Sequence, residues 1–548
     1  MLSYRKLAMR VLGRPLHTGG NDSPRPASQR AAALVLTAAM LTALTAPAFA
    51  ETWDIEKGDI TVRAGKTEGT NMVSQGEQKD VEDTGTVITG KSDRNTVTIE
   101  AKDKDDKVEV TLKDLNIDAS SGSEAAVSVT GEGNTNIELD GDNALKSDIY
   151  SSGISSSGSL TISGGENDSL TAQGGSGADG IYSSGSLTIS GGTVTANGGS
   201  GGGGDGGDGI WSSGGVTISG GSTVTANGGD GKDDYGGDGI RSDSGDVTIS
   251  GGSTVTANGG NGGNVSGDGI RSDSGDVTIS GGTVKAAGGD SKDGYGGDGI
   301  RSGGVTISGG TVNAAGGNGG KVGGYGICSF ARVAISGGTV NAAGGNGKNS
   351  NGGSDGIISN DIDLSGSLEL TAKAGRPNGK AISWAGHELD LDTIKDKLGP
   401  GAKVTATDAN GETKQVSSPI PRPVEPEEPE PVIPEESSSS SDGGSAAPSA
   451  PASFLPGLTV TDKDGQRISY TSIRGNNVLS IRVGRFTASL RASLAALRQL
   501  RAEGIDTITF QTILCSTTLS VDELLAMGGE DAEAVLTHRL TASSLTVG

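Results

Sequence analysis

The sequence predicts an all-β protein: a right-handed parallel β-helix with coils of about 30 residues and three short strands per coil, followed by a small C-terminal α/β unit. Three observations predict this fold. The tripeptide Asp-Gly-Ile returns about every 30 residues. Two further phrases, Val/Leu-Thr-Ile-Ser-Gly-Gly and Thr-Val-x-Ala, keep in step with it. Within each phrase apolar and polar residues alternate, which is the period of a strand with one buried face.

The regular coils occupy residues 151–380. Glycine pairs follow the strands, and glycine supplies the positive φ that a tight corner needs. Stacked coils pair in parallel about 4.8 Å apart, so columns of Ile, Val and Ala fill one continuous interior. Each coil needs its neighbours, because it cannot bury its apolar face alone. The isoleucines of the first phrase are Ile181, Ile210, Ile240, Ile270, Ile300, Ile327 and Ile357.

Residues 1–50 differ from the rest of the chain. A basic lead precedes an apolar run that ends in Ala48-Phe49-Ala50, which is the order found in a secretory signal peptide. We therefore predict cleavage after Ala50 and a secreted or cell-surface location, with a retained membrane anchor as the alternative. No later segment is apolar enough to span a bilayer, so a membrane-spanning protein is not predicted.

Composition divides the remaining chain. A Pro/Glu-rich and then Ser-rich segment is typical of a linker. The last segment contains strand patterns and an amphipathic helix pattern over residues 489–504. It has no assigned function and is the candidate contact with a cell wall or another surface partner. In order, the segments are 51–150, an N-terminal cap with irregular first coils; 381–416, a C-terminal cap; 417–456, the linker; and 457–548, the α/β module.

The charge of the chain restricts its partners. The formal net charge is −24, and loss of residues 1–50, with six basic and one acidic residue, would make it −29. A chain this acidic, with 3% aromatic residues and no basic stripe, is not expected to bind nucleic acid. The two cysteines, Cys328 and Cys515, fall in different segments and do not form a disulfide framework.

The residue after each isoleucine of Asp-Gly-Ile points outward, because neighbours along a strand alternate between faces. These residues stack into a column on one outer face. Aromatic rings can stack on sugar rings, and arginine forks bind carboxylates in pairs, so the column suits an acidic polysaccharide. Alternatively, large side chains cover the sheet and the arginines offset its acidic charge. The predicted ligand-binding residues are Tyr182, Trp211, Arg241, Arg271 and Arg301, followed in the column by Cys328 and Ile358.

The aspartate of the same phrase also stacks from coil to coil. Two interpretations remain open. Each carboxylate caps its own turn by accepting backbone N–H bonds, or the column binds calcium through carboxylates and loop carbonyls. The candidate metal ligands are Asp179, Asp208, Asp238, Asp268, Asp298 and Asp355.

Several phrases between about residues 85 and 375 resemble a secreted bacterial carbohydrate-binding family whose parallel β-helix has the shape of pectate lyases. They include VEVTLKDLNIDAS, EAAVSVTGEGNTNIELDGDNAL, GISSSGSLTISGG and the repeated GGDGIRS and VTISGGTVTA. The resemblance implies binding of plant-type polysaccharide, including acidic pectic chains, with calcium in the helix and without hydrolysis. The long Gly/Asn/Asp loops and the acidic charge depart from the family.

A catalytic site needs a distinct set of residues, and the coils offer none. After residue 50 the histidines are His387 and His538, both outside the coils, and no Ser-His-Asp order or zinc spacing occurs. We therefore predict a non-catalytic polysaccharide-binding protein. The alternatives are a surface adhesin or structural stalk, and a pectate-lyase-like enzyme that uses Asp/Arg pairs of the repeat.

Overall fold

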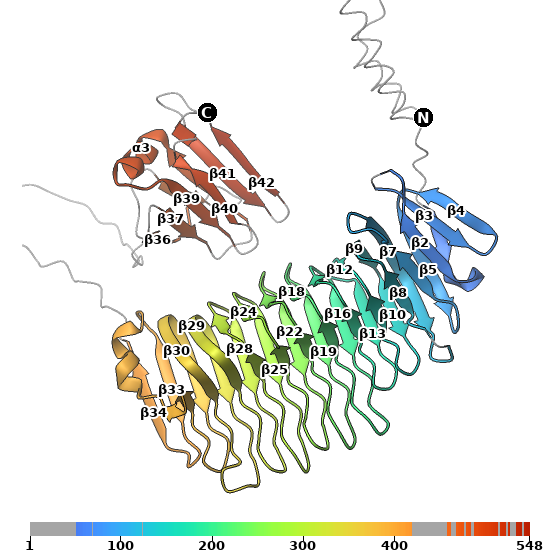
Figure 1. Cartoon of the computed structure of the whole chain (residues 1–548). Helices are drawn as coiled ribbons and strands as arrows, with labels where there is room; N and C mark the ends of the chain where they lie inside the picture. The colour runs from blue at the N-terminus through green and yellow to red at the C-terminus, as the bar shows by residue number, and fades with distance from the viewer. Residues whose placement is uncertain are drawn as a thin grey trace, which may run out of the picture. The chain divides into compact units, whose positions relative to one another are not determined.

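A computed structural model describes residues 51–418, except 68 and 123, and parts of residues 458–547. Gaps in the latter lie at 462–466, 469, 476–477, 484–486, 513–515, 522–523, 526–532 and 540–541. The predicted signal peptide, nearly all of the predicted linker, and Cys515 lie outside the described residues. The chain forms two compact units, one within residues 1–425 and the other within 426–548 (Figure 1).

The first unit is a parallel β-helix, which confirms the predicted fold class. In each regular coil, Ile-x-Ser forms the first strand, Val-Thr-Ile the second and Thr-Val-x-Ala the third, and each pairs in parallel with the same strand of the next coil. Isoleucine faces isoleucine and valine faces valine in these pairs. The pairing therefore builds three long sheets around one interior (Figure 1).

The strands have the following bounds. The first sheet contains β2 (Ile60–Ala64), β6 (Val97–Glu100), β8 (Val127–Thr130), β11 (Ile154–Ser156), β14 (Ile181–Ser183), β17 (Ile210–Ser212), β20 (Ile240–Ser242), β23 (Ile270–Ser272) and β26 (Ile300–Ser302). The second contains β1 (Thr52–Asp54), β5 (Thr86–Ser92), β7 (Lys107–Asp118), β9 (Asn134–Asp140), β12 (Ser159–Gly164), β15 (Leu187–Ile189), β18 (Val216–Ile218), β21 (Val247–Ile249), β24 (Val277–Ile279) and β27 (Val305–Ile307). The third contains β10 (Asp142–Lys146), β13 (Ser169–Gln173), β16 (Thr193–Asn197), β19 (Thr223–Asn227), β22 (Thr254–Asn258), β25 (Thr283–Ala287) and β28 (Thr311–Ala315). Two long strands, β29 (Ile327–Ala343) and β30 (Ile357–Lys373), continue all three sheets.

The interior consists of the alternating apolar residues of the three phrases. In one coil Ile210, Val216, Ile218, Val224 and Ala226 are all at most 1% exposed. Burial of a Val or Ile side chain stabilises a fold by about 1.5–3 kcal/mol. Repetition of this set in every coil explains why a glycine-rich chain with few aromatic residues still builds a continuous core.

Glycine serves two different purposes at the corners. The pair Gly251 and Gly252 after the second strand has φ of 65° and 77°, as predicted. The Gly-Gly pairs after the third strand, which include Gly228, do not have positive φ, so the predicted reason is wrong there. The glycines of Gly-Asp-Gly do not have it either. Their reason is close packing: a Cβ on Gly267 would lie 1.8 Å from the carbonyl oxygen of Gly237 in the preceding coil.

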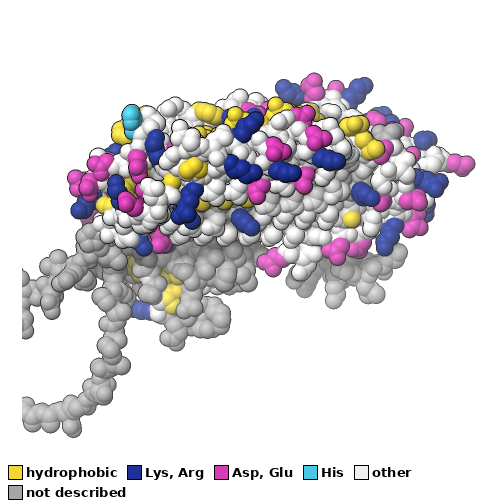
Figure 2. Space-filling view, turned by 90° about the horizontal axis from the view of Figure 1, so that it is seen from below, with side chains coloured by type: hydrophobic (Ala, Val, Ile, Leu, Met, Phe, Trp, Pro, Cys, Tyr) yellow, Lys and Arg dark blue, Asp and Glu magenta, His cyan; other side chains and the backbone are white. Residues whose placement is uncertain are grey.

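The long loops after the third strand are also bonded from coil to coil. The backbone N–H of Asn261 donates to Oδ1 of Asp230 (2.8 Å), and that of Asp290 donates to Oδ1 of Asn261 (2.9 Å). The pattern continues from Asn318 to Asp290 (2.6 Å). The loops hang below the sheets in Figure 1, and the view from below in Figure 2 shows basic and acidic side chains interspersed rather than gathered in one basic patch.

Both ends of the β-helix carry additional elements. At the N-terminal end β2, β3 and β4 form an antiparallel meander, and at the C-terminal end β34 pairs in antiparallel fashion with β33. These elements are η1 (Ile55–Lys57), β3 (Asn71–Gln75), β4 (Gln78–Asp83), β31 (Ile382–Trp384), β32 (His387–Glu388), η2 (Leu391–Lys397), β33 (Lys403–Thr407) and β34 (Thr413–Ser417). Among the described residues no helix is long and apolar enough to cross a membrane.

The second unit is the predicted small α/β module. Its helix α3 (Leu494–Ala502) is shorter than predicted, because residues 488–493 form a strand between two antiparallel neighbours. The side chain of Ser493 caps the helix by accepting the N–H of Ala496 (3.2 Å). One sheet contains β35 (Leu458–Thr461), β38 (Ala488–Ser493), β41 (Glu533–Arg539) and β42 (Ala542–Val547); the other contains β36 (Thr471–Gly475), β37 (Val478–Arg482), β39 (Thr507–Gln511) and β40 (Ser516–Ser520).

Candidate functional site

The predicted ligand-binding residues form a single column on the outer face of the first sheet. Tyr182 pairs with Trp211, Trp211 with Arg241, and each arginine with the next, one residue per coil. Cys328 continues the column beyond Arg301. Burial raises the pKa of the Cys328 thiol to about 12, so this cysteine is protonated and inert at neutral pH.

The aromatic end of the column is held by three contacts. The rings of Tyr182 and Trp211 lie edge to face, with centroids 5.2 Å apart and planes at 75°. The indole Nε1 of Trp211 donates to Oδ2 of Asp243 (2.9 Å), and the Arg241 guanidinium lies 5.1 Å from the centroid of the Trp211 ring. These contacts fix the orientation of the indole.

The arginines of the column are already paired with carboxylates. Nε of Arg241 bonds Asp243 (3.0 Å), and its Nη2 bonds Asp273 of the next coil (3.1 Å). Nε of Arg271 bonds Asp273 (2.6 Å), and Nη1 of Arg301 lies 3.6 Å from the carboxylate of Asp298. An acidic ligand would have to compete with these carboxylates.

The aspartate column lies next to the arginines and is almost fully buried. The backbone N–H of Asp208 donates to Oδ1 of Asp179 (2.7 Å), and that of Asp238 donates to Oδ1 of Asp208 (2.5 Å). The same bond recurs to Asp238, Asp268, Asp298 and Asp355, from the N–H groups of Asp268, Asp298, Tyr325 and Lys380. The prediction that each aspartate caps its own turn is wrong. The parallel stack places an N–H of the next coil over each carboxylate, which therefore links two coils.

Burial strongly perturbs the titration of these carboxylates. Desolvation raises the pKa of Asp179 and of Asp298 to about 6, although a backbone N–H bond and arginine charges act in the opposite direction. Desolvation followed by repulsion from neighbouring aspartates raises the pKa values of Asp208 and Asp268 well above the usual range. Desolvation also raises the pKa of Asp238.

The aspartate column fits a calcium ion poorly. One oxygen of each carboxylate accepts a backbone N–H, while arginine Nη1 atoms lie 3.9 Å from Oδ2 of Asp238 and 3.6 Å from Oδ2 of Asp298. Calcium requires six to eight oxygen ligands, and a neighbouring guanidinium repels a cation. Among the described residues no group of three or more His, Cys, Asp or Glu side chains is placed to hold a metal ion. Calcium binding stays a prediction.

A hollow of about 590 Å³ opens where the column changes from small to aromatic residues. Thr98, Ser128 and Ser155 precede Tyr182 in register. Their short side chains leave the space that the Tyr182 and Trp211 rings close at one end. We call this space the aromatic hollow; its other lining residues are Glu124, Ala125, Tyr150, Ser151, Ser152 and Asp179. The aromatic hollow was not predicted from the sequence, although the change from serine to tyrosine in the column is visible there.

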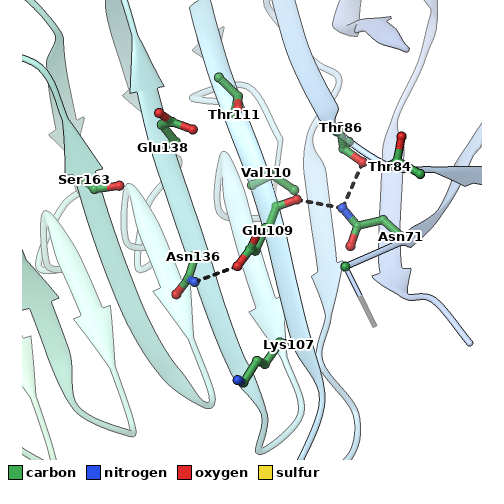
Figure 3. A pocket seen from close by; sticks show the side chains of 12 residues that line it. Asn71, Thr84, Thr86, Lys107, Glu109, Val110, Thr111, Asn136, Glu138 and Ser163 are labelled. Carbon is green, nitrogen blue, oxygen red and sulfur yellow. Dashed lines mark hydrogen bonds between the residues drawn. The ribbon is translucent and has the colours of Figure 1, made fainter. Parts of the chain in front are cut away.

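A second pocket lies at the N-terminal end of the second sheet, and we call it the hairpin pocket (Figure 3). It measures about 570 Å³. The strands β7, β9 and β12 provide one side; Asn71 at the start of the β3–β4 hairpin, Gly69 in the turn before it, and the turn into β5 provide the other. It is lined by Gly69, Asn71, Thr84, Gly85, Thr86, Lys107, Glu109, Val110, Thr111, Asn136, Glu138 and Ser163. This pocket was not predicted, because the antiparallel hairpin carries no repeat signal in the sequence.

Comparison with known proteins supports the fold. A family model described as a beta helix repeat matches residues 216–240, 277–300 and 305–327. Each match runs from the second strand of one coil to the first strand of the next. Neither the curated proteins nor the solved structures gave a match to this chain.

Proposed function

We propose that this chain is a non-catalytic polysaccharide-binding protein, secreted or at the cell surface, and that the aromatic hollow is its main contact with the glycan. The observation that carries the proposal is the change in side-chain size along the column, from Ser155 in one coil to Tyr182 and Trp211 in the next two. It leaves a concave surface with two fixed aromatic rings at one end of a row of hydroxyls.

The lining of the hollow supports a sugar ligand. The rings of Tyr182 and Trp211, with that of Tyr150, a residue that is 84% exposed, offer apolar surface for the C–H faces of sugar rings. Ser128 and Ser155 supply hydroxyls that both donate and accept hydrogen bonds. Concave surfaces that combine aromatic side chains with a few polar groups are typical of ligand sites.

The charges favour a neutral glycan over a polyuronate at this place. The ionisable carboxyl groups of the hollow are Glu124 and Asp179, which would repel uronate groups when charged. The arginines that were predicted to bind an acidic chain are paired with Asp243, Asp273 and Asp298. A plant-type neutral polysaccharide is therefore the proposed ligand, and pectic chains are the comparison.

The pairing of the column arginines with aspartates also argues against the alternative that this protein is a lyase. An arginine that acts as a base must present a free nitrogen to the substrate, whereas Arg241 and Arg271 are engaged by carboxylates of their own and the next coil. The Asp/Arg set is repeated in several coils, so it marks no single reaction centre. Formation of unsaturated products from polygalacturonate would contradict this part of the proposal.

We expect Trp211→Ala to weaken binding of a neutral oligosaccharide about 10- to 30-fold, the size of a 1.4–2 kcal/mol hot spot. Isothermal titration calorimetry of the full chain measures this, with and without calcium. Trp384→Ala is the matched control, because Trp384 is also a tryptophan of the first sheet, is exposed, and lies six coils further along the β-helix, away from the hollow. Equal binding by wild type and Trp211→Ala would overturn the site. Failure to bind any neutral or acidic glycan would favour the structural stalk.

A further inference from the structure

The hairpin pocket stands at one end of an uncharged column on the second sheet. The charged pocket residue Glu109 pairs with Asn136, where the uncharged column begins, and Asn136 pairs with Thr161. From Thr161 the same outward position is threonine in coil after coil. The column continues through Thr188, Thr217, Thr248, Thr278 and Thr306. These hydroxyls are spaced about 4.8 Å apart.

Asn71 is the fixed polar group of the pocket. It is only 5% exposed, and its Nδ2 donates to Oγ1 of Thr86 (2.9 Å) and to the carbonyl oxygen of Glu109 (2.7 Å) (Figure 3). Both amide hydrogens are thereby used. Its Oδ1 accepts no hydrogen bond from any residue that the structure describes, so a buried side chain leaves an acceptor for a ligand.

The charged groups of the pocket are also available. The carboxylate of Glu109 accepts one bond from a described residue, through Oε1 from Nδ2 of Asn136 (3.3 Å). Glu138 and Lys107 form no ion pair with another described residue, and both line the pocket (Figure 3). Free acceptors and a free donor within one pocket match the hydroxyl groups of a sugar, which donate and accept at once.

We propose that the second sheet binds a neutral linear glycan along the threonine column and holds the end of that chain in the hairpin pocket. The proposal rests on the proposed function in one respect, that the ligand is a polysaccharide, but it uses another sheet and other residues. The uncharged column gives no partner to a polyuronate. Beyond Glu109 the pocket is lined by Thr84 and Gly85 of the turn before β5 and by Asn71, so we place the end of the glycan chain there.

The test uses the full chain and calorimetry with a neutral β-linked hexasaccharide, the matching disaccharide, and a cyclic glucan that has no chain end. Wild type should show two binding events with the hexasaccharide. Glu138→Ala should weaken one of them about tenfold and leave the other, and Trp211→Ala should do the reverse. Lys107→Ala is a second pocket variant, and both changed side chains are exposed.

Further variants separate the column from the pocket. Thr217→Lys should weaken the hexasaccharide event of the second sheet and leave disaccharide binding in the pocket unchanged. The cyclic glucan should not bind there. One binding event, or two events that neither Glu138→Ala nor Lys107→Ala changes, would overturn this inference while the aromatic hollow stands. If Trp211→Ala keeps both binding events unchanged, the aromatic hollow is overturned instead. If no probe binds the wild type, both proposals are overturned.

Discussion

Replacing Gly267 with alanine is expected to lower the free energy of unfolding by about 3 kcal/mol or more, at the upper end of what overpacking costs. The new Cβ would lie 1.8 Å from the carbonyl oxygen of Gly237 and 2.4 Å from its carbonyl carbon. Both are backbone atoms that no rotamer change can move. The two coils would have to separate at this corner, which would lengthen the bond from the N–H of Asp268 to Asp238 (2.6 Å).

Gly203→Ala is the matched control for this experiment. Gly203 lies in a long loop of the same β-helix, and a Cβ there would meet no atom within 4 Å. Alanine should change the stability at this position by no more than about 0.5–1 kcal/mol, in either direction. Denaturant unfolding followed by circular dichroism compares the two variants with wild type. Equal midpoints for Gly267→Ala and Gly203→Ala would contradict the tight coil contact.

We expect the β-helix to be more stable at pH 5 than at pH 8, because the aspartate column binds protons more tightly when folded. For Asp298 the pKa rises from 3.8 to about 6 on folding, and two units correspond to about 3 kcal/mol. Stability from such a group is fully present below pH 3.8 and is lost as the pH rises through the folded pKa. Asp118 and Asp168 act in the opposite direction, since hydrogen bonds lower their pKa values.

Asp268→Asn tests the column directly. Asparagine keeps the oxygen that accepts the N–H of Asp298 (2.6 Å) and removes the charge that its neighbours repel. The melting temperature of the variant minus that of wild type should therefore increase as the pH rises from 5 to 8. Asp293→Asn, in an exposed loop, is the control and should follow the wild-type curve. A wild-type stability that rises steadily over this range, unchanged in Asp268→Asn, would refute the explanation.

Much of the fold was predictable from the sequence. The period of Ile210, Ile240 and Ile270, and the alternation within each phrase, specify parallel pairing in register, which the structure confirms. The same period placed Trp211 next to Arg241. The period could not predict the helix bounds in the second unit, where residues 488–493 have both strand and helix patterns and pair as a strand between two neighbours.

The candidate sites depended much more on tertiary structure. The arginines were visible in the sequence, but their pairing with Asp243 and Asp273 depends on side chains from adjacent coils. The aromatic hollow needs the short residues of earlier coils, and the hairpin pocket needs the fold of an irregular segment. A repeat predicts what recurs, whereas both pockets form where the repeat changes.

The sequence by itself therefore determined the β-helix, because a period and a buried face leave one way to stack the coils. Only the tertiary structure decided how the stack is held. Gly267 is glycine because a carbonyl oxygen of the preceding coil occupies the place of its Cβ. The carboxylate of Asp238 is buried between two coils, where it accepts the backbone N–H of Asp268 in the next coil. Both reasons are contacts between residues about 30 positions apart, and such contacts exist only after the coils have stacked.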